Sequence, residues 1–83
     1  MSVPRTDQEI VADLISLCQE QRIKPADGSY KIDAAVCTEY LMEKYKETKE
    51  IIICIFINLA KDGYIRAVRG ERGEVVLVLD KDL

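Results

Sequence analysis

The side chains that most often carry chemistry are few in this sequence and widely spaced. Its cysteines, Cys18, Cys37 and Cys54, form no CxxC pair, and the chain has no histidine. Zinc sites are built from closely spaced Cys and His ligands, so this spacing argues against a metal site. A cysteine nucleophile would also lack its usual imidazole base. Because each cysteine falls within an apolar helical stretch, we expect reduced thiols packed as small apolar side chains.

The charged residues and glycines do not indicate a catalytic or cofactor site either. General acid–base catalysis at neutral pH most often uses histidine. The segments KDG and GERG are too short and too charged to be phosphate-cradling loops. A chain of 83 residues also has difficulty enclosing a pocket of useful volume. We therefore expect a non-enzymatic protein with no cofactor, no bound metal and no small-molecule substrate.

Basic side chains near the end of the chain are the best sequence evidence for a nucleic-acid partner. Arg66, Arg69 and Arg72 lie on or beside a glycine-bounded turn, where they could straddle phosphates, and Lys46 and Lys49 could add to them. Glutamates alternate with both groups, however, and the net charge of the chain is −3, the opposite of what attraction to phosphate requires. Duplex DNA is therefore the alternative partner rather than the first.

Local signals divide the chain into the elements that must position these residues. The capping box Thr6-Asp7-Gln8-Glu9 and an apolar repeat at three- and four-residue steps predict a helix over about 7–21. In RIKPADGSYKI, a turn at 25–28 separates two short alternating segments, 22–24 and 29–32, which fit a small hairpin or one short strand. Asp33 can cap a second helix that ends near Lys46. Its expected buried side consists of Ala34, Val36, Cys37, Tyr40, Leu41 and Tyr45.

The next segment, KEIIICIFINLAKDGYI, could be a strand or a helix, because its β-branched isoleucines favour a strand. Its ends favour a helix. Thr48 can cap the first turn, Glu50 suits the positive end of the helix dipole, and Gly63 stands where a left-handed residue ends a helix. We therefore predict a third helix over about 49–61.

The rest of the chain predicts a β-hairpin, since YIRAVR, the turn GERG and EVVLVLD follow in order. The second strand, 75–79, has no polar alternation, so both of its faces should be covered. Residues 1–83 thus form one small α+β domain with three helices, a short β element between the first two, and a C-terminal hairpin. The longest apolar run, 51–57, is far below the roughly 20 residues of a membrane span, and we expect a cytoplasmic or nuclear protein.

This order of elements over residues 6–80 resembles the winged-helix branch of helix-turn-helix domains. The spacing of Leu59, Gly63 and Ile65, from the end of the third helix into the hairpin, carries the resemblance together with the glycine tip of the wing. A weaker similarity is to the DEP subgroup, which has a hairpin arm like RIKPADGSYKI and serves as a docking module in signalling proteins. In DNA-binding winged helices, the third helix enters the major groove and the wing touches the DNA backbone or the minor groove.

The winged-helix pattern directs Ile52, Ile55, Phe56 and Leu59 inward. The outward face of the third helix then consists of Lys49, Glu50, Ile53, Cys54, Ile57 and Lys61. Reading base edges requires hydrogen-bonding or cationic side chains, which two isoleucines and a cysteine do not offer. Leaving Ile53 and Ile57 in water would forgo roughly 1.5–3 kcal/mol each. We therefore expect this face to contact a protein, either a second copy or another subunit, unless the helical phase is shifted by one residue and the two isoleucines face the domain itself.

Overall fold

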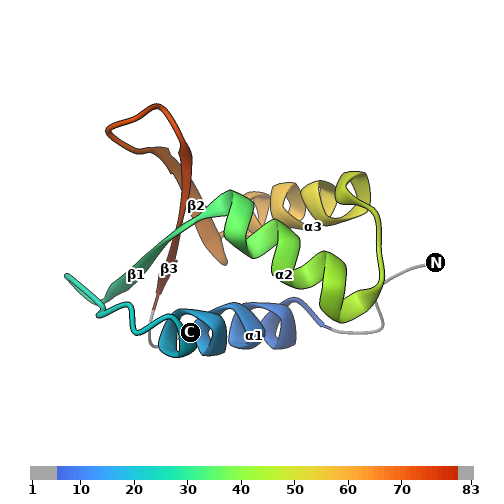
Figure 1. Ribbon diagram of the computed structural model, residues 1–83, viewed down its shortest axis with the longest axis horizontal. Coiled ribbons are helices and arrows are strands. Elements are labelled where there is room, and N and C mark those ends of the chain that lie inside the picture. The colour runs from blue at the N-terminus through green and yellow to red at the C-terminus, as the bar shows by residue number, and fades with distance from the viewer. Residues whose placement is uncertain (1–5, 81–83) are drawn as a thin grey trace.

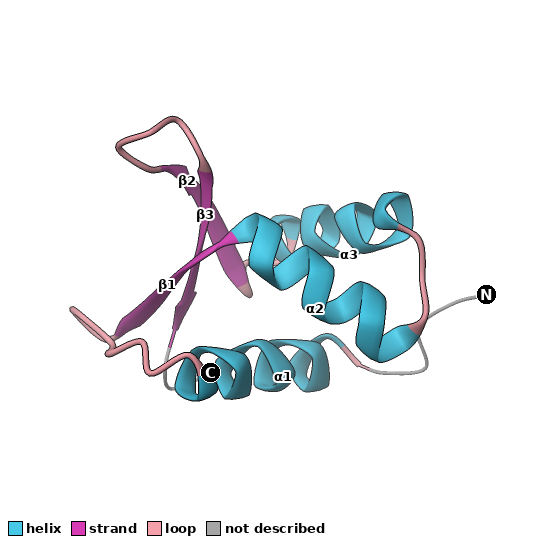
Figure 2. Cartoon of the chain, viewed as in Figure 1, coloured by secondary structure: helices cyan, strands magenta, loops and turns pink. Residues whose placement is uncertain are grey.

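The computed structural model describes residues 6–80 and contains three helices and a three-stranded antiparallel sheet (Figures 1 and 2). This confirms a small α+β domain with one β element between the first two helices and a C-terminal hairpin. The helix predicted over 49–61 is present with those bounds. The elements in chain order are α1 (Asp7–Glu20), β1 (Ser29–Asp33), α2 (Ala34–Tyr45), α3 (Lys49–Lys61), β2 (Ile65–Arg69) and β3 (Val75–Asp80).

The predicted capping residues set the ends of the helices. Thr6 and Glu9 form the capping box of α1, the Asp33 carboxylate accepts a hydrogen bond from an amide of the first turn of α2, and the Thr48 hydroxyl does the same for α3. Lys46, in the left-handed conformation, ends α2. Gly63 has a φ of +83°, a conformation that glycine adopts without steric cost, and it turns the chain from α3 toward β2.

The sheet has the order β1-β3-β2, so the last strand in sequence lies in the middle. On the face toward the helices, which we call the inner face, Leu79 lies between Tyr30 and Ile65, and Leu77 lies between Ile32 and Ala67. Leu77, Val78 and Leu79 are all buried, so both faces are covered over the second half of this strand, whereas Val75 is 45% exposed and the expectation is wrong at its first residue. This burial explains why β3, the central strand, lacks the alternation of polar and apolar residues that is typical of a strand with one exposed face.

One apolar core joins the inner face of the sheet to all three helices. Its fully buried side chains include Leu14 of α1, Leu41 of α2, and Ile52 and Leu59 of α3. The tip of the β2–β3 hairpin extends past the helices, on the side away from α1 (Figure 1). This overhang leaves part of the inner face of the hairpin without a helix to cover it.

Of the two forms expected for the segment between α1 and α2, the structure has one short strand, β1, and not a hairpin. Segment 22–24 forms no strand, and a single bridge between Ala26 and Ser29 closes a tight turn at Asp27-Gly28. Both turn residues have positive φ, as Asp-Gly turns commonly do.

Val36 was expected on the buried side of α2 but is 38% exposed. At 3.6 residues per turn it lies roughly 140° around the helix from the fully buried Leu41, nearly opposite the core. Thr38 is buried in its place, and its hydroxyl satisfies its hydrogen-bonding need by donating to the carbonyl of Ala34 at 2.8 Å. A threonine whose hydroxyl bonds the preceding turn can pack like an apolar residue.

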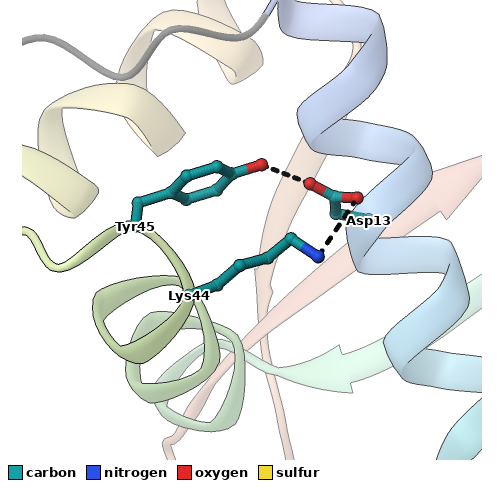
Figure 3. A network of polar contacts seen from close by, with 3 residues as sticks. All are labelled: Asp13, Lys44 and Tyr45. Carbon is teal, nitrogen blue, oxygen red and sulfur yellow. Dashed lines mark hydrogen bonds and ion pairs between the residues drawn. The ribbon is translucent and has the colours of Figure 1, made fainter.

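A polar network fastens α1 to the end of α2 (Figure 3). The Tyr45 hydroxyl donates a hydrogen bond to one carboxylate oxygen of Asp13, and Lys44 Nζ lies 3.7 Å from the other. Although Asp13 is charged, only 15% of its side chain is exposed. Because these residues are far apart in the sequence, the residue pattern of a single helix could not predict this contact.

Candidate interaction groove

Helix α3 separates its apolar residues onto two faces. Ile52, Phe56 and Leu59 are buried in the core, whereas Ile53 is 41% exposed and Ile57 is 60% exposed. This confirms the predicted direction of the two isoleucines and excludes the shifted helical phase. The domain core covers one apolar face of α3, and a second apolar surface would be needed to cover the other face.

The exposed isoleucines form one wall of a groove of about 520 Å³. The start of α2 forms a second wall, and the overhanging inner face of the hairpin forms the third. We call this hollow the α3 groove. Its lining residues are Asp33, Ala34, Ala35, Thr38, Lys49, Ile53, Phe56, Ile57, Ala67, Glu74, Val75 and Leu77.

The hairpin contributes to the groove through the alternation of its side chains. Ala67 and Leu77 are paired across the two strands, and Val75, two residues before Leu77, points to the same face. Leu77 lies under the helices and is buried, whereas Val75 lies beyond them and is 45% exposed. These hairpin residues and Phe56 were missing from the predicted site. The sequence predicted that Val75 would be covered as part of its strand. The pattern of residues within a single strand does not show whether its hairpin extends past the helices.

Further hollows continue the groove along α2. One of about 420 Å³ shares Ala35, Thr38 and Lys49 with the α3 groove and adds Glu39 and Met42. The next, of about 380 Å³, shares Glu39 and Met42 and reaches the turn between α2 and α3. We call its three glutamates, Glu39, Glu43 and Glu47, the acidic end of the groove.

The groove and its continuation hold the surplus negative charge of the chain. Their lining contains the carboxylates of Asp33, Glu74 and the acidic end against Lys46 and Lys49, a net charge of −3. The whole chain also has a net charge of −3, so its remaining acidic and basic residues are equal in number. The groove with its continuation along α2 is therefore the acidic region of an otherwise balanced molecule.

The predicted interface residues divide between the groove and the surface outside it. Lys49, Ile53 and Ile57 line the groove. Glu50, Cys54 and Lys61 are exposed on the same helix but do not line the groove. The helical periodicity thus located half of the predicted set within the groove.

No protein-family model, curated protein or solved structure matches this sequence. Within residues 6–80, none of the helices is both long enough and apolar enough to cross a membrane. Over the same residues, histidine, cysteine and carboxylate side chains nowhere gather in a group that could hold a metal ion.

The basic residues considered for nucleic acid are dispersed over the structure. Arg66 and Arg69 are an odd number of residues apart in β2, so their side chains leave opposite faces of the sheet. Lys46 Nζ lies 3.4 Å from a carboxylate oxygen of Glu43. Lys49 lines the apolar groove instead of an open cationic surface. These side chains do not converge on one face.

The arginines at the hairpin tip are partly engaged in the tip itself. The guanidinium of Arg69 donates a hydrogen bond to the carbonyl of Gly73 at 2.9 Å. The backbone amide of Arg72 donates to the Glu74 carboxylate at 2.9 Å, which places an acidic group next to the basic ones. The tip is therefore a mixed-charge turn.

The cysteines are all free, but they differ in environment. Cys18 and Cys37 are fully buried in the core, as expected. Burial raises the pKa of the Cys18 thiol, and burial, with smaller electrostatic contributions from Cys18 and Asp33, raises the pKa of Cys37 to about 12. Cys54 is exposed, so the expectation that it packs as a core side chain is wrong. It stands on the face of α3 opposite the core.

Proposed function

We propose that this chain is a non-enzymatic winged-helix module that docks a protein partner in the α3 groove. The observation that carries the proposal is the pair Ile53 and Ile57, exposed by 41% and 60% in a concave apolar site. The element order, with a hairpin following the third helix and the sheet order β1-β3-β2, supports the winged-helix assignment. In that description the β2–β3 hairpin is the wing, and the groove lies between the wing and the third helix.

The free energy available at the groove supports docking. Full burial of an isoleucine contributes about 1.5–3 kcal/mol, so two half-exposed isoleucines together with Val75 offer several kcal/mol to a partner that covers them. Concave apolar sites with a few polar groups at the rim are typical binding sites. Here the rim groups are Lys49, Asp33 and Glu74.

A protein partner is favoured over duplex DNA for electrostatic reasons. A DNA backbone placed against the third helix and wing would approach the carboxylates that line the groove. Its phosphates would find no converging set of lysines and arginines there. A partner that is either another protein or a second copy of this chain suits the apolar lining.

Site-specific photo-crosslinking in the cell of origin tests the proposal. A photoreactive benzoylphenylalanine at position 57 should give covalent adducts with a protein partner of defined mass. The same group at Val68, which is 40% exposed elsewhere on the hairpin, should not. Ile53→Ala in the position-57 protein should reduce the adduct because it removes part of the same apolar surface.

Two results would contradict docking in the groove. One is an equal yield of the same adducts at positions 57 and 68, which would indicate unspecific contact. The other is the absence of adducts at position 57 together with a monomeric chain in sedimentation over a wide concentration range. Either result would leave the exposed isoleucines without a partner.

A further inference from the structure

We propose that the segment docked in the α3 groove is an amphipathic helix whose apolar side chains lie toward the wing and whose basic side chains lie over the acidic end. This inference rests on the proposed docking function and specifies the partner's chemistry. It follows from the shape of the groove, the state of its backbone groups and the distribution of charge.

The groove suits a helix better than an extended peptide. Its walls are side chains of α2, α3 and the inner face of β3, and the backbone of β3 at Leu77 is already paired with β1 and β2. Strands hydrogen-bond through their edges, and the groove lies on the inner face of the hairpin, so an occupant would meet side chains there instead of free backbone groups. A helix satisfies its own backbone groups and can present apolar side chains at three- and four-residue steps to such a groove.

The charge of the groove selects a basic occupant. The α3 groove and its continuation together have a net charge of −3, which is the entire surplus of the chain, and most of it lies at the acidic end. A second copy brings no surplus of positive charge to offset it, and a nucleic acid brings more negative charge. A segment with several lysines or arginines is electrostatically complementary to this surface.

The distribution of apolar and acidic residues along the groove and its continuation also determines which way round the docked helix should lie. Ile53, Ile57 and Val75 lie at the wing end, and Glu39, Glu43 and Glu47 lie at the end near the α2–α3 turn. Lys49 lines both the α3 groove and its continuation, and thus marks the change between the two parts. The apolar half of the helix should therefore cover the isoleucines while its basic half extends past Lys49.

Three matched synthetic peptides test this in NMR titrations of the isotopically labelled full chain. Each is a helix-forming peptide of about 18 residues, roughly 27 Å long. The first has leucines at helical spacing in one half and lysines in the other, the second has glutamates in place of the lysines, and the third has serines in place of the leucines. The lysine–leucine peptide should shift amide resonances of the groove residues, such as Thr38, Ile53 and Ile57, and the other two should not.

Variants of the chain separate the apolar and electrostatic contributions. Ile57→Ser should weaken binding of the lysine–leucine peptide about tenfold or more, whereas Val68→Ser, a matched change on the other face of the hairpin, should not. Glu39→Lys/Glu43→Lys should weaken binding about threefold to tenfold, and the control Glu20→Lys/Glu71→Lys should have little effect. Raising NaCl from about 50 to about 300 mM should weaken binding to the unmodified chain more than to the Glu39→Lys/Glu43→Lys variant.

The outcomes distinguish this inference from the docking proposal. Equal or tighter binding of the glutamate–leucine peptide, or shifts confined to surfaces outside the groove, would overturn the basic helix. Self-association that shifts the groove resonances, with no binding of any peptide, would also overturn it but would leave docking intact with a second copy as occupant. Absence of peptide binding, self-association and crosslinking at position 57 would overturn both.

Discussion

Ile57 keeps 60% of its surface exposed on a helix whose opposite face is buried. The difference between Ile57 and its neighbour Ile52, which is fully buried, comes from their angular positions around α3, since the side-chain types are the same. The same contrast separates the exposed Cys54 from the buried Cys18 and Cys37. At the scale of single residues, direction around a helix therefore decides between a role in the core and a role at the surface.

Ile53→Ala/Ile57→Ala should leave the fold nearly intact. Because both side chains are about half exposed, we expect each truncation to lower the free energy of unfolding by about 1 kcal/mol or less. The control Ile52→Ala changes the same residue type in the same helix but creates a core cavity, and it should cost about 2–5 kcal/mol. Urea unfolding followed by circular dichroism measures both. Similar losses for the surface pair and for Ile52→Ala would show that Ile53 and Ile57 stabilise the core.

Thiol reactivity should reveal one accessible cysteine. At pH 8 the native chain should react rapidly with a disulfide reagent such as DTNB at Cys54 alone, because Cys18 and Cys37 are buried and burial raises the pKa of both thiols, that of Cys37 to about 12. Both stay protonated in the folded state at this pH, whereas unfolding in denaturant should make all three thiols reactive. Cys54→Ser should remove the rapid phase. A second fast-reacting thiol in that variant would contradict the described core.

At the scale of elements, the sequence predicted those features that local interactions determine. Thr6, Asp33 and Thr48 cap the helices, and Gly63 ends α3, because each of these effects involves only neighbouring residues. Those signals correctly outweighed the strand preference of the isoleucines. Val36 was misassigned because a helix with apolar residues around much of its circumference does not show which direction its neighbours occupy.

The groove itself could not be predicted from the sequence, because it depends on how elements far apart in the chain are placed. Val75 and Ala67 face Ile57 only because the hairpin overhangs the helices. The contact of Asp13 with Lys44 and Tyr45 likewise joins α1 to α2 across a long stretch of chain. Periodicity located Ile53 and Ile57 on a surface but supplied no information about the other walls.

Gly63→Ala tests the junction between α3 and the hairpin. A Cβ at this position would meet no atom within 4 Å, so the cost arises from the backbone φ of +83° alone. We expect a loss of about 1–2 kcal/mol in the free energy of unfolding. Gly63→Asn should cost less, since asparagine adopts the left-handed conformation more readily. An alanine variant as stable as the parent would show that this turn takes another conformation.

At the scale of the whole molecule, charge is distributed unevenly although the chain is nearly balanced. The acidic surplus lies along the groove, and the arginines of the hairpin are separated onto different faces and mixed with glutamates. The long-range field of the chain should therefore attract basic partners to the groove and repel polyanions from it.

The chain should not bind duplex DNA measurably. A fluorescent random duplex of about 20 base pairs, titrated at about 50 mM salt, should show no change in anisotropy at protein concentrations where non-specific binders, with dissociation constants of roughly 10⁻⁴–10⁻⁶ M, already respond. Reversing the acidic end with Glu39→Lys/Glu43→Lys/Glu47→Lys should create weak, salt-sensitive binding. Salt-sensitive binding by the unmodified chain that is lost in Arg69→Ala/Arg72→Ala would instead favour the nucleic-acid alternative.

The central position of β3 also has a consequence for how the protein is made. On the ribosome, β1 emerges early and β2 later, but neither has a strand to pair with until residues 75–80 have left the exit tunnel. Until then Tyr30 and Ile32 have no strand beside them, although α1, α2 and α3 can already coil locally. Sheet formation must therefore follow synthesis of residues 75–80, and a nascent chain stalled before Val75 would present an incomplete core to chaperones.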